Sequence, residues 1–328
     1  MLVSWLLEGE DNPIVSILSK GGVFSVERVL SMENQQLIDL SAFRWNDQDV
    51  VFLKHFLSKR CSDQSDPPAS LEQLFDHHRY FTHTLSSGSP VLDGLIGGIR
   101  TEQLVELSGE SSTGKSELCM SACADAVLNH RVKVLYIDSG GNFDYKRFYE
   151  ILVSKLQFDS IHTSIENKAK KVMAMVSVAQ ASDIQSLSVV MAQTCDIIES
   201  DSSEHPFRLV VVDSLTPLLS PLVGTGGKHS KAGYAVLSRT AMALRRLAVK
   251  FGIAVLYTNS TVRDTMSPFF IMKPSLGLSW ISVPDVRILL SRHEESKVIA
   301  QLIKSRNQSL PEPSQFLTLE VLPRVIKM

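Results

Sequence analysis

The sequence predicts an α/β protein, a mostly parallel sheet with helices on both faces, preceded by a small helical domain. Strand-like and helix-like apolar patterns alternate over most of the chain. The run Phe207 to Val212 is continuously apolar, as a central strand buried on both faces requires. The stretch Leu107 to Leu118, LSGESSTGKSEL, joins a strand pattern to a helical pattern through a loop rich in glycine and serine.

This loop has the composition and spacing of a phosphate-binding loop. Gly109, Gly114, Lys115 and Ser116 satisfy G-x-x-x-x-G-K-[ST], whose backbone N–H groups close around phosphates while the lysine neutralises the outer ones. The glycines allow close approach of the anion, and the serine hydroxyl suits a magnesium ion bridging the phosphates. The predicted nucleotide-binding residues are Gly109, Glu110, Ser111, Ser112, Thr113, Gly114, Lys115 and Ser116.

Composition indicates a soluble, unsecreted protein. The chain has 328 residues, of which 44% are hydrophobic, and no stretch is long and apolar enough to span a bilayer. The net charge of −2 gives no global attraction to nucleic acid, so any such contact must come from local basic clusters. Of the four cysteines, Cys119 and Cys123 lie one helical turn apart on an apolar face, which predicts buried free thiols.

Three segments are expected. Residues 1–60 carry short apolar-periodic runs and predict a small helical domain, either a docking or weak DNA-contacting module or a passive cap. Residues 61–82 predict a linker because they include CSDQSDPPAS. Residues 83–328 form the nucleotide domain. His77, His78 and His83 have no acidic or cysteine partner at ligand spacing, so no metal is predicted there.

The nucleotide domain alternates strands and helices after the phosphate loop. The patterns predict strands at 132–137, 172–178 and 207–212 and helices at 145–156, 183–198 and 234–251. Asp213 follows the continuously apolar strand, at the sheet edge where α/β folds bind ligands. It is the predicted magnesium carboxylate, together with the Ser116 hydroxyl. The alternatives are that Asp213 caps a turn or helix, and that Asp138, which ends another strand, takes this role.

Five sequence blocks together resemble the core of the RecA-like strand-exchange recombinases over about residues 80–320. They are SSGSPVLDGLIGGI, GESSTGKS, VLYIDSGGNF, LVVVDSLTPLL and GIAVLYTNSTVRD. The helical N-terminal module and linker are similar to those of eukaryotic members. LGLSWISVPDVRILL, followed by KSRNQ, is most similar to the D-type recombinase paralog.

The resemblance implies a RecA-like P-loop ATPase core that binds ATP and Mg²⁺. It also implies DNA-stimulated hydrolysis and a task in homologous recombination and DNA repair. D-type paralogs are expected to act in a heteromeric complex with other recombinase paralogs, on single-stranded or branched DNA, in the nucleus. No membrane contact is expected, and no clear basic localisation run is present.

Two positions depart from the family pattern. After YID, Gly140 stands where the recombinases place the glutamate that activates the attacking water, so we expect a weak DNA-dependent ATPase at most. Ser260 stands in TNS, where a glutamine usually reports the state of the γ-phosphate to the DNA-binding loop. A serine is shorter, so coupling between nucleotide and DNA would have to use Asn259 or a water molecule.

The family resemblance places two loops along the DNA path. The first, about Leu219 to Gly233, contains Lys228 and Lys231, and the second, Thr261 to Ser275, carries charged and aromatic candidates. Those in the second loop are Arg263, Phe269, Phe270 and Lys273. Either loop could instead be a plain surface loop, and the aromatic pair could dock a protein. Arg287, Lys304 and Arg306 are candidates to touch a neighbouring subunit's ATP.

Three functions therefore compete. The first is an ATP-binding, DNA-associated subunit of recombination repair, and the second is an assembly adaptor whose interface is locked by nucleotide, without DNA contact or hydrolysis. The third, a small-molecule P-loop kinase, would need a substrate lid, and the sequence offers no candidate for one.

Overall fold

The computed structural model describes residues 13–23, 26–42, 44–63, 70, 83–159, 165–201, 203, 205–222, 231–263, 272–293, 297–306 and 317–320. The chain divides into two compact units, residues 1–76 and 77–328. No helix in these ranges is long and apolar enough to cross a membrane.

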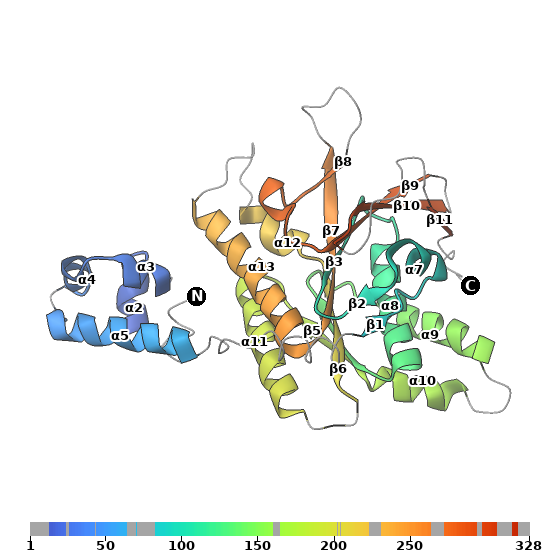
Figure 1. Ribbon diagram of the computed structural model, residues 1–328, viewed down its shortest axis with the longest axis horizontal. Coiled ribbons are helices and arrows are strands. Elements are labelled where there is room, and N and C mark those ends of the chain that lie inside the picture. Colours follow the sequence, from blue (N-terminus) through green and yellow to red (C-terminus); the bar gives the residue numbers. More distant parts are fainter. Residues whose placement is uncertain are drawn as a thin grey trace. The chain divides into compact units, whose positions relative to one another are not determined.

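The first unit is helical where it is described. Its helices are α2 (Pro13–Lys20), α3 (Val26–Ser31), α4 (Asn34–Leu40) and α5 (Asp47–Asp63), coloured blue in Figure 1. Apolar side chains at helical spacing, such as Leu18, Leu37 and Leu57, are fully buried in its core. Helix α5 runs past the predicted boundary at residue 60, because the first strong helix breakers are Pro67 and Pro68.

The second unit is built on one large sheet, in which nine strands are described. The order is β11-β10-β9-β3-β7-β6-β4-β5, with β8 paired to β7; β10, β11 and β8 run antiparallel to their neighbours, and the others run parallel. A separate two-stranded sheet is formed by β1 (Thr84–Leu85) and β2 (Ile99–Arg100). The bounds are β3 Leu104–Gly109, β4 Lys133–Asp138, β5 Val176–Gln180, β6 Phe207–Asp213, β7 Ala254–Arg263, β8 Met272–Pro274, β9 Val286–Arg292, β10 Lys297–Lys304 and β11 Leu317–Glu320.

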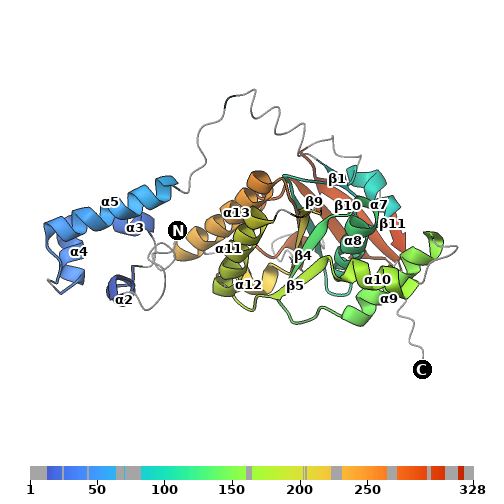
Figure 2. The same cartoon turned by 90° about the horizontal axis from the view of Figure 1, so that it is seen from below.

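Helices cover both faces of this sheet. Figures 1 and 2 both show α11 (Ile184–Ser200) and α13 (Lys231–Phe251) on one side, and α8 (Lys115–His130), α9 (Tyr145–Asp159) and α10 (Ile165–Met173) on the other. The short elements are α7 (Pro90–Ile96), α12 (Thr216–Leu219) and the 3₁₀ turns Ser220–Leu222 and Leu278–Trp280.

Strand β4 illustrates why the central strands read as continuous apolar runs. Val134 and Tyr136 pack on the side of α8 and α9, whereas Leu135 and Ile137 pack on the side of α11 and α13. Successive side chains of a strand point to opposite faces, so a strand covered twice needs apolar residues at every position. The predicted doubly covered α/β core is confirmed.

One predicted strand begins too early. The expected strand at 172–178 is helical to Met173, and β5 begins only at Val176. Ala169 and Val172 are buried three residues apart, which is helical spacing, and the sequence pattern did not separate this last helical turn from the strand that follows.

Candidate nucleotide-binding site

The phosphate loop joins the fully buried strand β3 to α8, which begins at Lys115. Gly114, which precedes the helix, has a φ of 83°, a left-handed conformation that glycine adopts without strain. A Cβ on Gly109 would lie 2.5 Å from the Leu290 carbonyl oxygen, so only glycine fits where β3 passes β9. These are the two positions of the motif at which the backbone itself requires glycine.

Lys115 lies within this loop. Its ammonium donates to the carbonyl oxygens of Gly109 at 2.9 Å and Glu110 at 2.5 Å. Burial lowers the pKa of Lys115, and the charge of Asp213 partly opposes that change. The ammonium is therefore a partly desolvated cation near the predicted magnesium carboxylate, a setting that favours a triphosphate with its metal.

Asp213 ends β6, at the same sheet edge as the phosphate loop. One carboxylate oxygen accepts from the Tyr136 hydroxyl at 2.7 Å, and the other accepts from the Thr258 hydroxyl at 2.5 Å. Burial is the main cause that raises the pKa of Tyr136, so its hydroxyl stays a donor. The carboxylate is held from both neighbouring strands, β4 and β7. An oriented carboxylate and the Ser116 hydroxyl are a donor set that fits a hydrated magnesium ion.

Two carboxylates, Asp138 and Asp144, stand at the two ends of the segment after β4, and Asp144 accepts from the N–H groups of Lys146 at 2.9 Å and Arg147 at 3.2 Å. Asp138, the rival candidate for magnesium, is buried and accepts from the backbone N–H groups of Gly140 at 3.1 Å and Phe143 at 2.9 Å. Ser139 is also occupied, since its hydroxyl donates to the Ser214 carbonyl at 2.7 Å and accepts from the Ser214 N–H at 2.8 Å. This segment is therefore held by hydrogen bonds to its own backbone and to Ser214, with Gly140 at the position of the expected water-activating group.

Ser260 lies directly beside the phosphate loop. It is paired in register with Gly109, and its N–H donates to the Thr216 hydroxyl at 2.7 Å. The preceding Asn259 is fully buried; its amide oxygen accepts from Thr216 at 2.9 Å and from Ser275 at 2.8 Å. The segments that flank both predicted DNA loops thus meet at Asn259.

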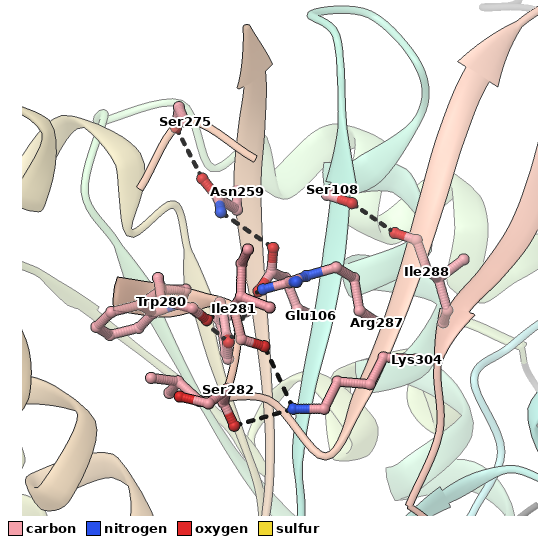
Figure 3. A network of polar contacts seen from close by, with 12 residues as sticks. Glu106, Ser108, Asn259, Ser275, Trp280, Ile281, Ser282, Arg287, Ile288 and Lys304 are labelled. Atoms are coloured by element: carbon pink, nitrogen blue, oxygen red, sulfur yellow. Dashed lines mark hydrogen bonds and ion pairs between the residues drawn. The ribbon is translucent and has the colours of Figure 1, made fainter. Parts of the chain in front are cut away.

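A buried polar network supports the strand that carries the phosphate loop (Figure 3). Glu106 on β3 is fully buried and accepts from Arg287 and Asn259, both at 3.0 Å, and from the Tyr257 hydroxyl at 3.1 Å. The Tyr257 hydroxyl in turn accepts from the indole of Trp280 at 3.2 Å. Buried charges of this kind require pairing, which this network supplies.

The network overturns one expectation. Arg287 was a candidate to reach a neighbouring subunit's ATP, but it is 4% exposed and ion-paired with Glu106, so it serves the core of its own chain. Lys304 donates to the carbonyl oxygens of Ile281 and Ser282, as Figure 3 shows. The Arg306 side chain remains largely exposed, and its guanidinium nitrogen Nη1 forms an ion pair with the Asp285 carboxylate oxygen Oδ1 at 3.5 Å.

The predicted DNA contacts fall mostly outside the described residues. Lys228, Phe269 and Phe270 lie there entirely, as do the side chains of Lys231, Arg263 and Lys273. The backbone still corrects the loop limits. Helix α13 begins at Lys231, and strands β7 and β8 include Arg263 and Lys273. Only residues 223–230 and 264–271 separate the flanking elements, because the helical and strand patterns extend further into both loops than expected.

Three residues of the site escaped prediction from sequence. Tyr136 and Thr258 read as ordinary strand residues, although each orients Asp213. A signal was present for Glu106, because an acidic residue inside an apolar strand requires a buried partner. The sequence alone did not indicate that this partner is Arg287, 181 positions away.

Comparison with known proteins supports this reading of the fold. The family model described as Rad51 matches residues 78–318. The bovine "DNA repair protein RAD51 homolog 4" is 30% identical over 299 residues, which cover 90% of this chain and 86% of that protein. The mouse protein of the same name is 30% identical over 224 residues, 68% of this chain and 65% of that protein. The "DNA repair protein XRCC3 homolog" of Arabidopsis thaliana is 25% identical over 248 residues, 69% and 81% of the two chains. The chain therefore belongs to the Rad51 family, among the eukaryotic paralogs of the RecA-like recombinases, and it resembles the D-type paralogs.

Proposed function

We propose that this chain is an ATP-binding, DNA-associated subunit of a recombinase-paralog complex that acts in homologous-recombination repair of DNA breaks and stalled forks. The observation that carries the proposal is the pairing of a complete phosphate loop with an oriented carboxylate. Lys115 offers a partly buried ammonium, and Asp213 is held by hydroxyl groups from two neighbouring strands. Residues 109–116 would bind the phosphates, and Ser116 and Asp213 would hold Mg²⁺.

Bound magnesium would neutralise charge on the phosphates, but hydrolysis also requires a base to accept the proton of the attacking water. Gly140 has no side chain to do this, and Asp138 is engaged by two backbone N–H groups. Loss of a positioned base lowers the rate of hydrolysis by about 10²- to 10⁴-fold, which raises the activation free energy by roughly 3 to 5 kcal/mol. We therefore propose tight binding with weak intrinsic ATPase, unless a partner chain supplies the missing group.

The names of the relatives support the biological assignment. The bovine, mouse and Arabidopsis proteins are all named as DNA repair proteins. From this we propose a nuclear location, a complex with other recombinase paralogs, and contact with single-stranded or branched DNA through residues 223–230 and 264–271 and the ends of the elements that flank them.

A binding and turnover experiment on the purified chain tests this proposal. We expect the wild type to bind a fluorescent ATP analogue in the presence of Mg²⁺, and K115A to lose this binding. With ATP, phosphate release by the wild type should stay near the background rate with or without single-stranded DNA. Turnover equal to that of an active recombinase, or no nucleotide binding by the wild type, would contradict it.

One observation favours a second candidate, a nucleotide-locked adaptor without DNA contact. Ser260 is too short to replace a glutamine that spans from the phosphate to the DNA loops, and its N–H is already bonded to Thr216. K115A separates the candidates. If the chain is an adaptor, the variant loses partner binding, and the wild type shows no DNA binding to lose.

A further inference from the structure

A polar cavity lies at the edge of the sheet opposite the nucleotide site. It has a volume of about 360 Å³, and its charged or titratable lining residues are His83, His130, Arg131, His205 and Arg208. These residues come from the C-terminal end of α8, the start of β6 and the segment before β1. The phosphate loop instead follows the end of β3, which runs parallel to β7 and, through it, to β6. The two sites are therefore separated by the length of the strands.

The cavity wall is held by backbone hydrogen bonds. His83 and Thr101 are joined by a 2.9 Å bond from the Thr101 N–H to the His83 carbonyl. Arg131 ends α8 in the left-handed conformation, with a φ of 53°, and its N–H bonds to helical carbonyl groups. The Arg208 guanidinium donates to the Phe251 carbonyl at 3.1 Å. Hydrogen bonds thus fix the backbone at His83 and Arg131 and the guanidinium of Arg208.

The electrostatics of this cavity suit an anion. Burial, followed by the charge of Arg208 and then of His130, lowers the pKa of His83. Burial also lowers the pKa of Arg208. Among the described residues that line the cavity none is acidic, and the described part of the chain contains no cluster suited to a metal ion. Cationic groups that disfavour one another's charge would be stabilised by a bound anion.

We propose that this cavity binds a phosphate monoester. Such a group carries a charge of about −1.5 to −2 at pH 7 and three strong acceptor oxygens. Two guanidinium groups and three imidazoles line the cavity, and their N–H groups are donors of the kind that such oxygens accept. The volume matches a pocket for a small group, since ligand pockets measure about 300 to 1,000 Å³. A nucleic-acid backbone instead needs a groove of charges that follows successive phosphates.

The test uses inorganic phosphate and must exclude the phosphate loop, which also attracts anions. Binding is measured as the phosphate-dependent rise in melting temperature of the full chain, because a ligand of the folded state stabilises it by mass action. Four proteins are compared: wild type, K115A, R131Q and the double variant. We expect K115A to retain phosphate-dependent stabilisation and the double variant to lose it, with an apparent Kd raised by about 10- to 100-fold.

Matched variants and ligands complete the design. R131K, which keeps the charge, should retain most of the affinity, and K171Q, an exposed site on α10, should change nothing. A phosphoserine peptide, tested against its unphosphorylated form, distinguishes a phosphorylated side chain from a free phosphate compound as the source. Loss of all phosphate binding in K115A alone would overturn the proposal. The proposal would also be overturned if R131Q weakened the binding of an oligothymidylate but left the binding of phosphate and of the phosphoserine peptide unchanged.

Discussion

The phosphate loop and the segment after β4 lie at the same edge of the sheet but offer different chemistry. The phosphate loop has a desolvated ammonium and glycines at the two positions that need them. In the segment after β4, the carboxylates of Asp138 and Asp144 both accept hydrogen bonds from nearby backbone N–H groups. Binding and hydrolysis rely on different groups in such sites, so one can persist without the other. Variants of the two segments should therefore change binding and hydrolysis separately.

The largest expected effect is a gain of activity in G140E. A glutamate at this position should raise the ATPase rate by about 10²- to 10⁴-fold, measured as phosphate release with Mg²⁺. A Cβ at Gly140 meets the Asn142 side-chain nitrogen at 2.4 Å, so the double variant G140E/N142A provides the space if the single one does not.

The control for this gain is G140Q, which has the size of glutamate but no basic carboxylate. An equal rise in G140E and G140Q would show that shape rather than proton transfer limits the rate. If the ATPase rate rose in neither G140E nor G140E/N142A, the attacking water would have to be positioned away from residue 140.

The next effect concerns the support beneath the phosphate loop. R287M should leave the fully buried Glu106 without its ion-pair partner and cost about 3–5 kcal/mol of unfolding free energy. The measurement is a urea titration of Trp280 fluorescence in a background where Trp5 and Trp45, which lie in the first unit, are replaced by phenylalanine. R306Q is the matched control, because that arginine is exposed and its pair with Asp285 should contribute less than about 1 kcal/mol. A similar loss of unfolding free energy in R287M and R306Q would contradict the view that only the buried ion pair matters for stability.

A smaller effect is expected from Lys115 itself. K115A should weaken binding of an ATP analogue by about 10- to 1,000-fold, because it removes a charge-assisted contact with the phosphates. The unfolding free energy should change little, since the ammonium bonds only to carbonyl groups and one hydroxyl of its own loop. Unchanged affinity would remove the loop from the binding site.

The smallest effect is on the pH dependence of that affinity. Burial lowers the pKa of Lys115, so in the free protein the protonated form that binds phosphate is lost at a lower pH than for an exposed lysine. As the pH rises, the affinity for the ATP analogue should therefore begin to fall before the pH reaches 10.5, the ordinary pKa of a lysine. K115R stays charged and should give a flat profile, and equal slopes in the two proteins would contradict this account.

Local patterns were sufficient to predict the doubly covered sheet, the order of strand, loop and helix around Gly109 to Ser116, and the buried thiols of Cys119 and Cys123. Each depends on spacing within one element. The partners of Asp213 were not predictable, because Tyr136 and Thr258 are 77 and 45 positions away and reach it only through strand order. Arg287 was misassigned for the same reason, since a basic residue in a strand pattern does not reveal a buried partner across the sheet.

The most direct test of the central claim is the identity of the nucleotide that stays bound. The purified chain is incubated with ATP and Mg²⁺ for many turnover times of an active recombinase, separated from free nucleotide, and its bound nucleotide is identified by chromatography. The account predicts stoichiometric ATP. Bound ADP, or a protein that retains no nucleotide, would contradict it.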